Sequence, residues 1–178
     1  ERLSSALLGL RRPLSLRTAL SSDESLLFRW ANDPQVRSNS CSPATIALAD
    51  HRTWYQSGLE DPNRLLLIAC DAQGCPIGQI RFDRESAPYA GRIDQARISL
   101  SLDRCVRGQG LATEIVMLGL QSMQRVWGSA VGVQAEIFSK NIPSQATFAK
   151  AGFVMDENTP LIDSSDDYLT VWNWKSAQ

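Results

Sequence analysis

Apolar positions along the first hundred residues switch between the two periods that separate strands from helices. Apolar residues alternate with polar ones along a half-buried strand, and they recur every three or four residues along one face of a helix. Residues 65–70 are instead continuously apolar, and turn-forming residues 71–74 connect them to a second apolar run, which predicts a buried β-hairpin. In order, the pattern predicts a strand at 14–18, a helix at 22–30 that Asn32-Asp33-Pro34 ends, a loop carrying Arg37, Asn39 and Cys41, and a helix at 48–59. Hairpin strands at 65–70 and 77–82, a loop at 86–91 and a strand at 96–102 follow.

The remaining residues continue the alternation of helices and strands. Residues 111–126 carry a broad apolar stripe of helical period, and residues 131–137 return to strand character. Asn141 begins a further helix, which Gly152 ends, and residues 168–174 form a last strand. The order of strand, two helices, three strands, helix, strand, helix and strand predicts an α+β domain with a mixed sheet.

Length and composition indicate one globular domain. The chain has 178 residues, of which 43% are hydrophobic and 21% charged, so it can bury a core without covalent cross-links. We assign this domain to residues 13–178. Residues 1–12 have a Leu- and Ala-rich helical pattern that Pro13 breaks, which predicts the tail of an upstream domain or a linker.

Charge and cysteine content narrow the possible partners. With 18 basic and 19 acidic residues the formal net charge is −1, so no broad basic field predicts binding to nucleic acid or to an anionic membrane. Cys70 and Cys75 flank a turn as half a zinc site would, but the chain has no second cysteine pair and only one histidine to complete it. We therefore expect reduced, mostly buried thiols and no metal. No apolar run approaches the roughly 20 residues that span a bilayer, so we expect a cytoplasmic protein. A homodimer is compatible with the sequence.

A glycine-bearing loop between a predicted strand and a predicted helix is the strongest chemical signal. Residues 107–112 read Arg-Gly-Gln-Gly-Leu-Ala. A helix N-terminus exposes unpaired N–H groups and carries about half a positive charge, so a glycine turn before it can hold a phosphate against bare backbone. A glycine turn that only connects a strand to a helix has the same local sequence, and the surrounding elements must decide between the two.

The surrounding sequence resembles the GNAT superfamily of N-acetyltransferases. Arg107, Gly110 and Ala112 match the family motif of Arg or Gln, then Gly three residues later, then Gly or Ala two residues after that. Residues 141–153 also resemble the family's Asn, small-residue helix and terminal Lys-x-Gly-Phe. The resemblance implies the GNAT fold, a mixed, mostly antiparallel central sheet flanked by helices. It further implies that this sheet splays between the fourth strand, 98–102, and the fifth, 133–137, with acetyl-CoA as donor lying between them.

Site residues follow from the same resemblance. The backbone around Leu102 would polarise the thioester carbonyl, and the amides of residues 107–113 would hold the pyrophosphate. Asn141 and Ser144 would face the pantetheine arm. The implied cofactor-binding residues are Leu102, Arg107, Gly108, Gln109, Gly110, Leu111, Ala112, Thr113, Asn141, Ser144 and Phe148.

A narrower resemblance concerns the acceptor. Residues 29–40, 51–55, 61–64 and 77–83 are similar to acetyltransferases of pseudaminic (nonulosonic) acid biosynthesis, which acetylate the 4-amino group of a UDP-amino-sugar. This implies a nucleotide-sugar acceptor in surface-polysaccharide synthesis and a possible fusion to an upstream nucleotide-sugar enzyme. The implied acceptor-binding residues are Arg37, Asn39, His51 and Arg81. Surface salt bridges are the alternative role for the charged ones, and Trp30, Trp54 and Tyr55 are expected in the core or cleft wall.

The predicted chemistry is direct attack of an amine on the thioester. Only a neutral amine attacks, so a weak base suffices, and Glu136 aligns with a glutamate that acts as base in related transferases. A solvated or paired position on a strand face is the alternative for Glu136. Many relatives carry a tyrosine acid where this chain has Phe148, which has no proton to give. Cys105 lies near the loop but has no identifiable base beside it, which argues against an acyl-enzyme.

Two other functions are also compatible with the sequence. Residues 30–36 also resemble acetyltransferases of ribosomal-protein N-termini, which implies a peptide acceptor and an open groove. The missing tyrosine is also compatible with a non-catalytic CoA-binding module.

Overall fold

The computed structural model describes residues 13–85, 94–157 and 168–175. The predicted tail at 1–12 and the predicted loop at 86–91 lie outside these residues. The described strands are β1 (Ser15–Thr18), β2 (Arg64–Cys70), β3 (Pro76–Glu85), β4 (Gln95–Leu102), β5 (Gly132–Phe138), β6 (Val154–Met155) and β7 (Leu169–Trp174). The helices are α1 (Glu24–Ala31), α2 (Pro34–Ser38), α3 (Leu48–Glu60), α4 (Leu111–Trp127) and α5 (Ile142–Lys150), with single 3₁₀ turns η1 (Ser21–Asp23) and η2 (Arg104–Val106).

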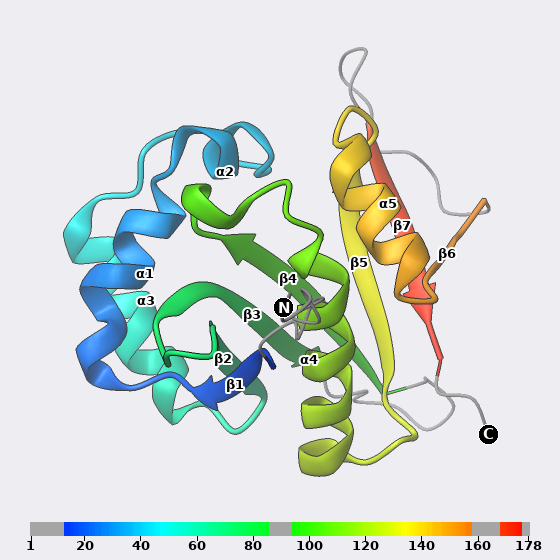
Figure 1. Cartoon of the computed structure of the whole chain (residues 1–178), viewed down its shortest axis with the longest axis horizontal. Helices are drawn as coiled ribbons and strands as arrows, with labels where there is room; N and C mark the ends of the chain where they lie inside the picture. The colour runs from blue at the N-terminus through cyan, green and yellow to red at the C-terminus, as the bar shows by residue number, and fades with distance from the viewer. Residues whose placement is uncertain (1–12, 86–93, 158–167, 176–178) are drawn as a thin grey trace, which may run out of the picture.

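One sheet organises the described residues. Its strand order is β1-β2-β3-β4-β5-β7-β6. Neighbouring strands are antiparallel except β4 and β5, which are parallel because the crossover helix α4 returns the chain to the same end of the sheet. Helices α1 to α3 lie on one side of the molecule, and α4 and α5 cover the other face (Figure 1). This architecture confirms the predicted GNAT fold.

The alternation of side chains along the strands builds two cores. Ile80 and Phe82 of β3 and Ile98 of β4 point toward α4, where they join the larger cluster. Leu66 and Ile68 of β2 point the other way and pack with residues of α1 and α3. β2 therefore contributes alternate residues to the two cores, with Leu67 and Ala69 on the α4 side and Leu66 and Ile68 on the other.

The two parallel strands separate after four paired residues. Their register ends at Ile98 opposite Ala135. Beyond that point β4 continues to Leu102 and β5 continues to Phe138, and Figure 1 shows the two strands diverging. The backbone of the last part of β4 thus has an open edge on the β5 side.

The β3–β4 register also shows which groups face this open edge. Gly78 lies opposite Leu102, and the flanking bond runs from Asp103 N to Ile77 O at 2.8 Å. In an antiparallel ladder such a pair is not hydrogen-bonded to itself, so the N–H and C=O of Leu102 point away from β3. They point toward the gap left by β5.

Some sequence predictions were wrong in detail. The segment after Pro34 was predicted to be a loop, but it begins with helix α2, and β6 was not predicted. The cysteines are free, but only Cys70 is buried, whereas Cys41, Cys75 and Cys105 are exposed. The prediction of mostly buried thiols failed because those three lie in turns or loops, where side chains meet solvent.

Candidate active site

A cleft of about 1200 Å³ lies where β4 and β5 separate. Its walls come from α1 to α3 on one side and from α4 and α5 on the other, and the ends of β3, β4 and β5 contribute to it. We call the part near α4 and α5 the donor side and the part near α1, α2 and α3 the acceptor side.

The donor side begins with the glycine loop. Gly108 and Gly110 have φ angles of 74° and 75°, a left-handed conformation that glycine adopts without strain. A Cβ at Gly108 would meet no atom within 4 Å, so backbone conformation and not packing requires glycine there. Gly110 is the N-cap of α4 and has no side chain to accept from the first N–H groups of that helix. These amides are available to an anion in the cleft.

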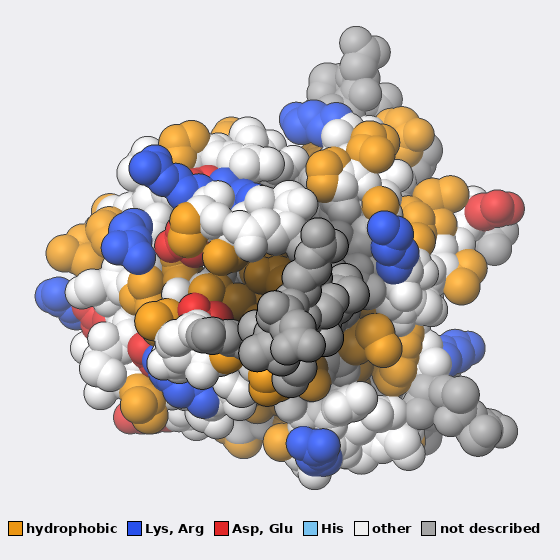
Figure 2. Space-filling view, in the orientation of Figure 1, with side chains coloured by type: hydrophobic (Ala, Val, Ile, Leu, Met, Phe, Trp, Pro, Cys, Tyr) orange, Lys and Arg blue, Asp and Glu red, His pale blue; other side chains and the backbone are white. Residues whose placement is uncertain are grey.

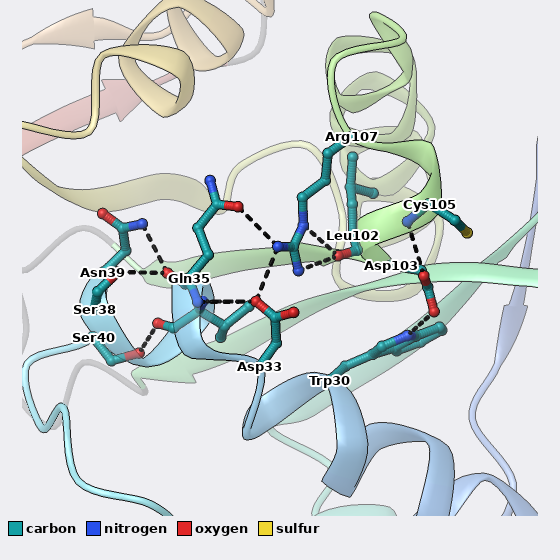
Figure 3. A network of polar contacts seen from close by, with 11 residues as sticks. Trp30, Asp33, Gln35, Ser38, Asn39, Ser40, Leu102, Asp103, Cys105 and Arg107 are labelled. Carbon is teal, nitrogen blue, oxygen red and sulfur yellow. Dashed lines mark hydrogen bonds and ion pairs between the residues drawn. The ribbon is translucent and has the colours of Figure 1, made fainter.

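The side chain of Arg107 fixes the loop to two other segments (Figure 3). Its Nε and Nη2 donate to the carbonyl oxygen of Leu102 at 3.0 and 2.9 Å. Its Nη1 donates to Asp33 Oδ1 and to Gln35 Oε1, each at 2.9 Å. The guanidinium is therefore engaged with protein groups, and it ties the end of β4 to the start of α2.

A second contact fixes the same corner. The indole Nε1 of Trp30 donates to Asp103 Oδ2 at 2.8 Å, and Cys105 N donates to Asp103 Oδ1 at 3.1 Å. The Trp30 hydrogen bond, followed by those from Cys105, lowers the pKa of Asp103 to about 2. Asp103 directly follows Leu102, so α1 and η2 together hold the residue next to the open edge of β4.

The α5 residues complete the donor side. Asn141 is the N-cap of α5, and its Oδ1 accepts from Ser144 N at 3.2 Å. Phe148 is 4% exposed and packs edge-to-face on Phe153, with ring centroids 4.9 Å apart. Asn141, Ser144 and Phe148 all line the cleft. The phenyl ring of Phe148 supplies a wall there and no proton.

Glu136 is the first residue of β5 beyond its last pairing with β4. It lines the cleft, is exposed, and forms an ion pair with Arg97 in which Nε and Oε1 are 3.3 Å apart. The same arginine also pairs with Glu85 at 2.9 Å. A carboxylate at this position borders the cleft and lies beside a cation.

Arg81, Trp54 and His51 line the acceptor side of the cleft. Arg81 donates through Nε to Asp83 Oδ2 at 2.6 Å, and its guanidinium lies 5.2 Å from the ring centroid of Trp54. His51 is 2% exposed, and its Nε2 lies 3.2 Å from the backbone oxygen of Glu24. Burial lowers the pKa of His51, so the ring is neutral at neutral pH and offers hydrogen bonding without charge.

Helix α2 forms the upper wall of the acceptor side. Arg37 donates through Nη1 to the carbonyl of Ser42 at 3.1 Å and through Nη2 to Ser40 Oγ at 3.0 Å. Its Nε is buried and has no hydrogen-bond partner among the described residues. Asn39 donates to the carbonyl of Gln35 at 2.9 Å. Most of the hydrogen bonds of Arg37 and Asn39 therefore go to groups of the same segment and fix its conformation.

The predicted site residues lie around one cleft with a single exception. Gln109 does not line it, and its side chain instead donates to the carbonyl of Cys105 at 2.9 Å. The other predicted residues, which line the cleft, are Arg37, Asn39, His51, Arg81, Leu102, Arg107, Gly108, Gly110, Leu111, Ala112, Thr113, Glu136, Asn141, Ser144 and Phe148. Sequence reasoning did not find Gln79, Ser99 and Ser101, which also line it. Their polar side chains alternate with apolar ones along β3 and β4, and this alternation could have identified them as residues on the face opposite the core.

Other chemistry has little support among the described residues. They contain no group of three or more His, Cys, Asp or Glu side chains that could hold a metal ion, and none of the described cleft-lining residues is a cysteine. Where the chain is described, no helix combines the length and apolarity needed to cross a membrane. On the face shown in Figure 2, Lys and Arg side chains occur at separate places and do not merge into one basic patch.

A seven-stranded sheet that parts beside a glycine loop and a helix N-terminus is the architecture of GNAT acyltransferases. The family model described as "Acetyltransferase (GNAT) domain" matches residues 14–154. Because this match spans most of the chain, the protein belongs to the GNAT acetyltransferase family, which confirms the prediction that it is an enzyme of this kind.

Solved structures share this fold. Spermidine N-acetyltransferase from Vibrio cholerae, solved with CoA and spermine, has a TM-score of 0.73 at 16% identity, covering 90% of this chain and 94% of its own. An aminoglycoside acetyltransferase with coenzyme A and kanamycin has a TM-score of 0.69 at 21% identity, covering 89% and 94%. A Salmonella typhimurium protein with acetyl-CoA has a TM-score of 0.74 at 16% identity, covering 93% and 95%. At these identities the likeness shows the fold alone. A search among curated proteins found no significant match.

Proposed function

We propose that this protein transfers an acetyl group from acetyl-CoA to the primary amine of a small molecule. The observation that carries the proposal is the uncapped N-terminus of α4, behind two left-handed glycines, opening into the cleft where β4 and β5 separate. Backbone N–H groups in this arrangement suit a pyrophosphate, and the open strand edge suits an extended arm with amide groups. Several structures of the same fold hold CoA or acetyl-CoA.

In the proposed mechanism each part of the cleft has a task. The loop amides from Gly108 to Thr113 hold the pyrophosphate, and the N–H of Leu102, which points toward the gap, hydrogen-bonds the thioester carbonyl. Acetyl-CoA supplies the activated acetyl group. The amine enters from the acceptor side, and Glu136 removes its proton through water. The new C–N bond forms as the C–S bond breaks. Because Phe148 cannot donate a proton, the CoA sulfur departs as a thiolate, and a thiol with a pKa of about 8.5 is a good enough leaving group to do so.

For the acceptor we propose a UDP-linked amino sugar, acetylated at its 4-amino group. Support comes from two arginines that line the acceptor side of the cleft. Arg81 is held by Asp83 through its Nε, and the buried Nε of Arg37 has no described partner. Guanidinium N–H groups suit the oxygens of a diphosphate. His51 and Asn39 offer neutral hydrogen-bonding groups to sugar hydroxyls.

A panel of acceptors tests this proposal. Release of free CoA from acetyl-CoA should be measured with UDP-amino-sugars, the corresponding free amino sugars, polyamines, aminoglycosides and peptides with free N-termini. Turnover that is fastest with a UDP-amino-sugar supports the proposed acceptor. Equal turnover of free and UDP-linked sugars, or faster turnover of a polyamine or a peptide, would contradict the acceptor and leave the acetyl transfer intact.

A further inference from the structure

The acceptor side of the cleft contains a buried polar atom to which the proposed reaction assigns no task. Gln79 of β3 and Ser101 of β4 lie directly opposite each other in the antiparallel register. The Nε2 of Gln79 donates to Ser101 Oγ at 3.1 Å. The other amide atom, Oε1, is buried and has no hydrogen-bond partner in the part of the chain that the structure describes. Because an unpaired buried acceptor costs free energy, this atom is a candidate for contact with a bound molecule.

The position of Gln79 points to the reacting end of the acceptor. Gln79 follows Gly78, and Gly78 is the residue opposite Leu102. The Leu102 side chain packs against the core under α4. Gln79 and Ser101 alternate with these core positions, so their side chains lie on the opposite face, which is the acceptor side. The Gln79 side chain therefore lies on the acceptor side of the cleft, at the strand pair adjacent to Leu102.

The strands hold this position tightly. A Cβ at Gly78 would lie 2.7 Å from both Leu102 Cδ2 and the backbone oxygen of Ser101. Only a residue without a Cβ allows β3 and β4 to approach this closely beside Gln79. The Ser101 hydroxyl in turn limits rotation of the Gln79 amide, so the free oxygen has a defined direction.

We infer that Gln79 Oε1 accepts a hydrogen bond from the N–H of the acceptor's reacting amine; this inference rests on the proposed acetyl transfer. A neutral primary amine has two N–H groups and one lone pair. One N–H donates to Gln79, the other leads through water to Glu136, and the lone pair faces the thioester carbon. An amide oxygen holds the amine and favours its protonated form less than a carboxylate would. Gln79 thus selects primary amines over secondary ones, and Ser101 is a positioning residue for it.

Three variants test the assignment against a matched control. Gln79→Leu removes the acceptor atom and should lower kcat/KM for the amine by about 10- to 100-fold, with KM for acetyl-CoA unchanged. Gln79→Glu still accepts a hydrogen bond, so it should keep activity at high pH but shift the acidic limb of the kcat/KM profile upward, because the carboxylate stabilises the ammonium form. Ser101→Ala should cause a smaller loss than Gln79→Leu.

The control is Gln134→Leu. Gln134 lies on β5 outside the cleft lining, and its Nε2 lies 3.4 Å from Asn173 Oδ1, so the same change there should leave the kinetics at the wild-type level. Wild-type kcat/KM in Gln79→Leu would overturn the assignment of Gln79 alone. Loss of activity in Gln79→Glu at every pH would also overturn the assignment, because it would indicate that the Gln79 amide donates a hydrogen bond to the acceptor and does not accept one. No turnover by the wild type with any amine overturns the proposed function and this assignment together.

Discussion

The two sides of the cleft are built in different ways. The donor side consists largely of backbone groups from one continuous segment, Leu102 to Thr113, in which two glycines and a helix N-terminus set the geometry. The acceptor side consists of side chains from α2, α3, β3 and β4, which lie far apart in sequence. A backbone site tolerates many side-chain changes but few conformational ones, whereas a side-chain site responds to single substitutions. The variants below test this difference.

The largest effect is expected for Gly110→Val. Valine at a φ of 75° is strained and places a branched side chain where the phosphate should lie. With wild-type protein, acetyl-CoA at 100 times its dissociation constant should stabilise the fold by about 2.7 kcal/mol, seen as a rise in Tm. We expect no rise for Gly110→Val. Gly74→Val is the control, because Gly74 has a φ of 79° in the turn between β2 and β3, and that variant should still show the rise.

Glu136→Gln should reduce kcat by about 10²- to 10⁴-fold while acetyl-CoA binding stays intact. Glutamine keeps the shape of the side chain and removes its basicity. The remaining activity should climb with pH as free amine accumulates. Glu85→Gln removes the other carboxylate paired with Arg97, away from the cleft lining, and should leave kcat unchanged. If Glu136→Gln has the kcat and pH profile of the wild type, Glu136 is not the base, and solvent removes the proton of the amine.

Arg107→Gln should affect stability and catalysis together. The change removes the side-chain donor of the Leu102 carbonyl and the guanidinium partner of the Asp33 carboxylate, and losing charged hydrogen bonds of this kind costs about 1.5–3 kcal/mol. Urea unfolding should show that loss, and kcat should fall because the Leu102 peptide loses its anchor. Arg104→Gln, at an exposed neighbouring position, should change neither. A Tm equal to wild type for Arg107→Gln would mean that the corner between β4 and α2 is held by other contacts.

The smallest effect concerns the acid stability of the Trp30–Asp103 contact. Asp103 has a pKa of about 2 in the folded protein, below the ordinary aspartate value of 3.8. The contribution of Asp103 is therefore fully present above about pH 4 and is lost as pH falls through about 2. Trp30→Phe removes the leading cause of the lowered pKa and should cost about 0.5–1.5 kcal/mol at pH 7. The difference in unfolding free energy between the two proteins should shrink toward pH 2; a difference that stays constant with pH would contradict this account.

Sequence reasoning predicted the elements with strong periodicity and failed where a short local signal competed. The run Asn32-Asp33-Pro34 was interpreted only as a helix end. In the structure Asp33 is also the N-cap of α2, since its carboxylate accepts from the backbone N–H groups of Gln35 and Val36, and Pro34 opens the helix. An Asp followed by Pro is an N-cap signal as well as a stop signal.

The candidate site was predictable to the extent that it is local. The glycine loop and the α5 N-terminus are contiguous motifs, so their place in the cleft followed from the sequence. The Arg107 guanidinium contacts Asp33, 74 residues away, and Gln79 meets Ser101 across 22 residues. Such pairs depend on strand register and helix placement, which a single sequence does not specify. They are also the contacts on which the acceptor side depends.

The most direct test of the backbone donor site is amide hydrogen exchange with and without acetyl-CoA. We predict slower exchange at the amides from Gly108 to Thr113 and at Leu102 when acetyl-CoA is bound, because these N–H groups become hydrogen-bonded to it. The amides of the Asp71–Gly74 turn, whose residues do not line the cleft, should exchange at an unchanged rate. Binding of acetyl-CoA with no change at the loop or at Leu102 would contradict the account.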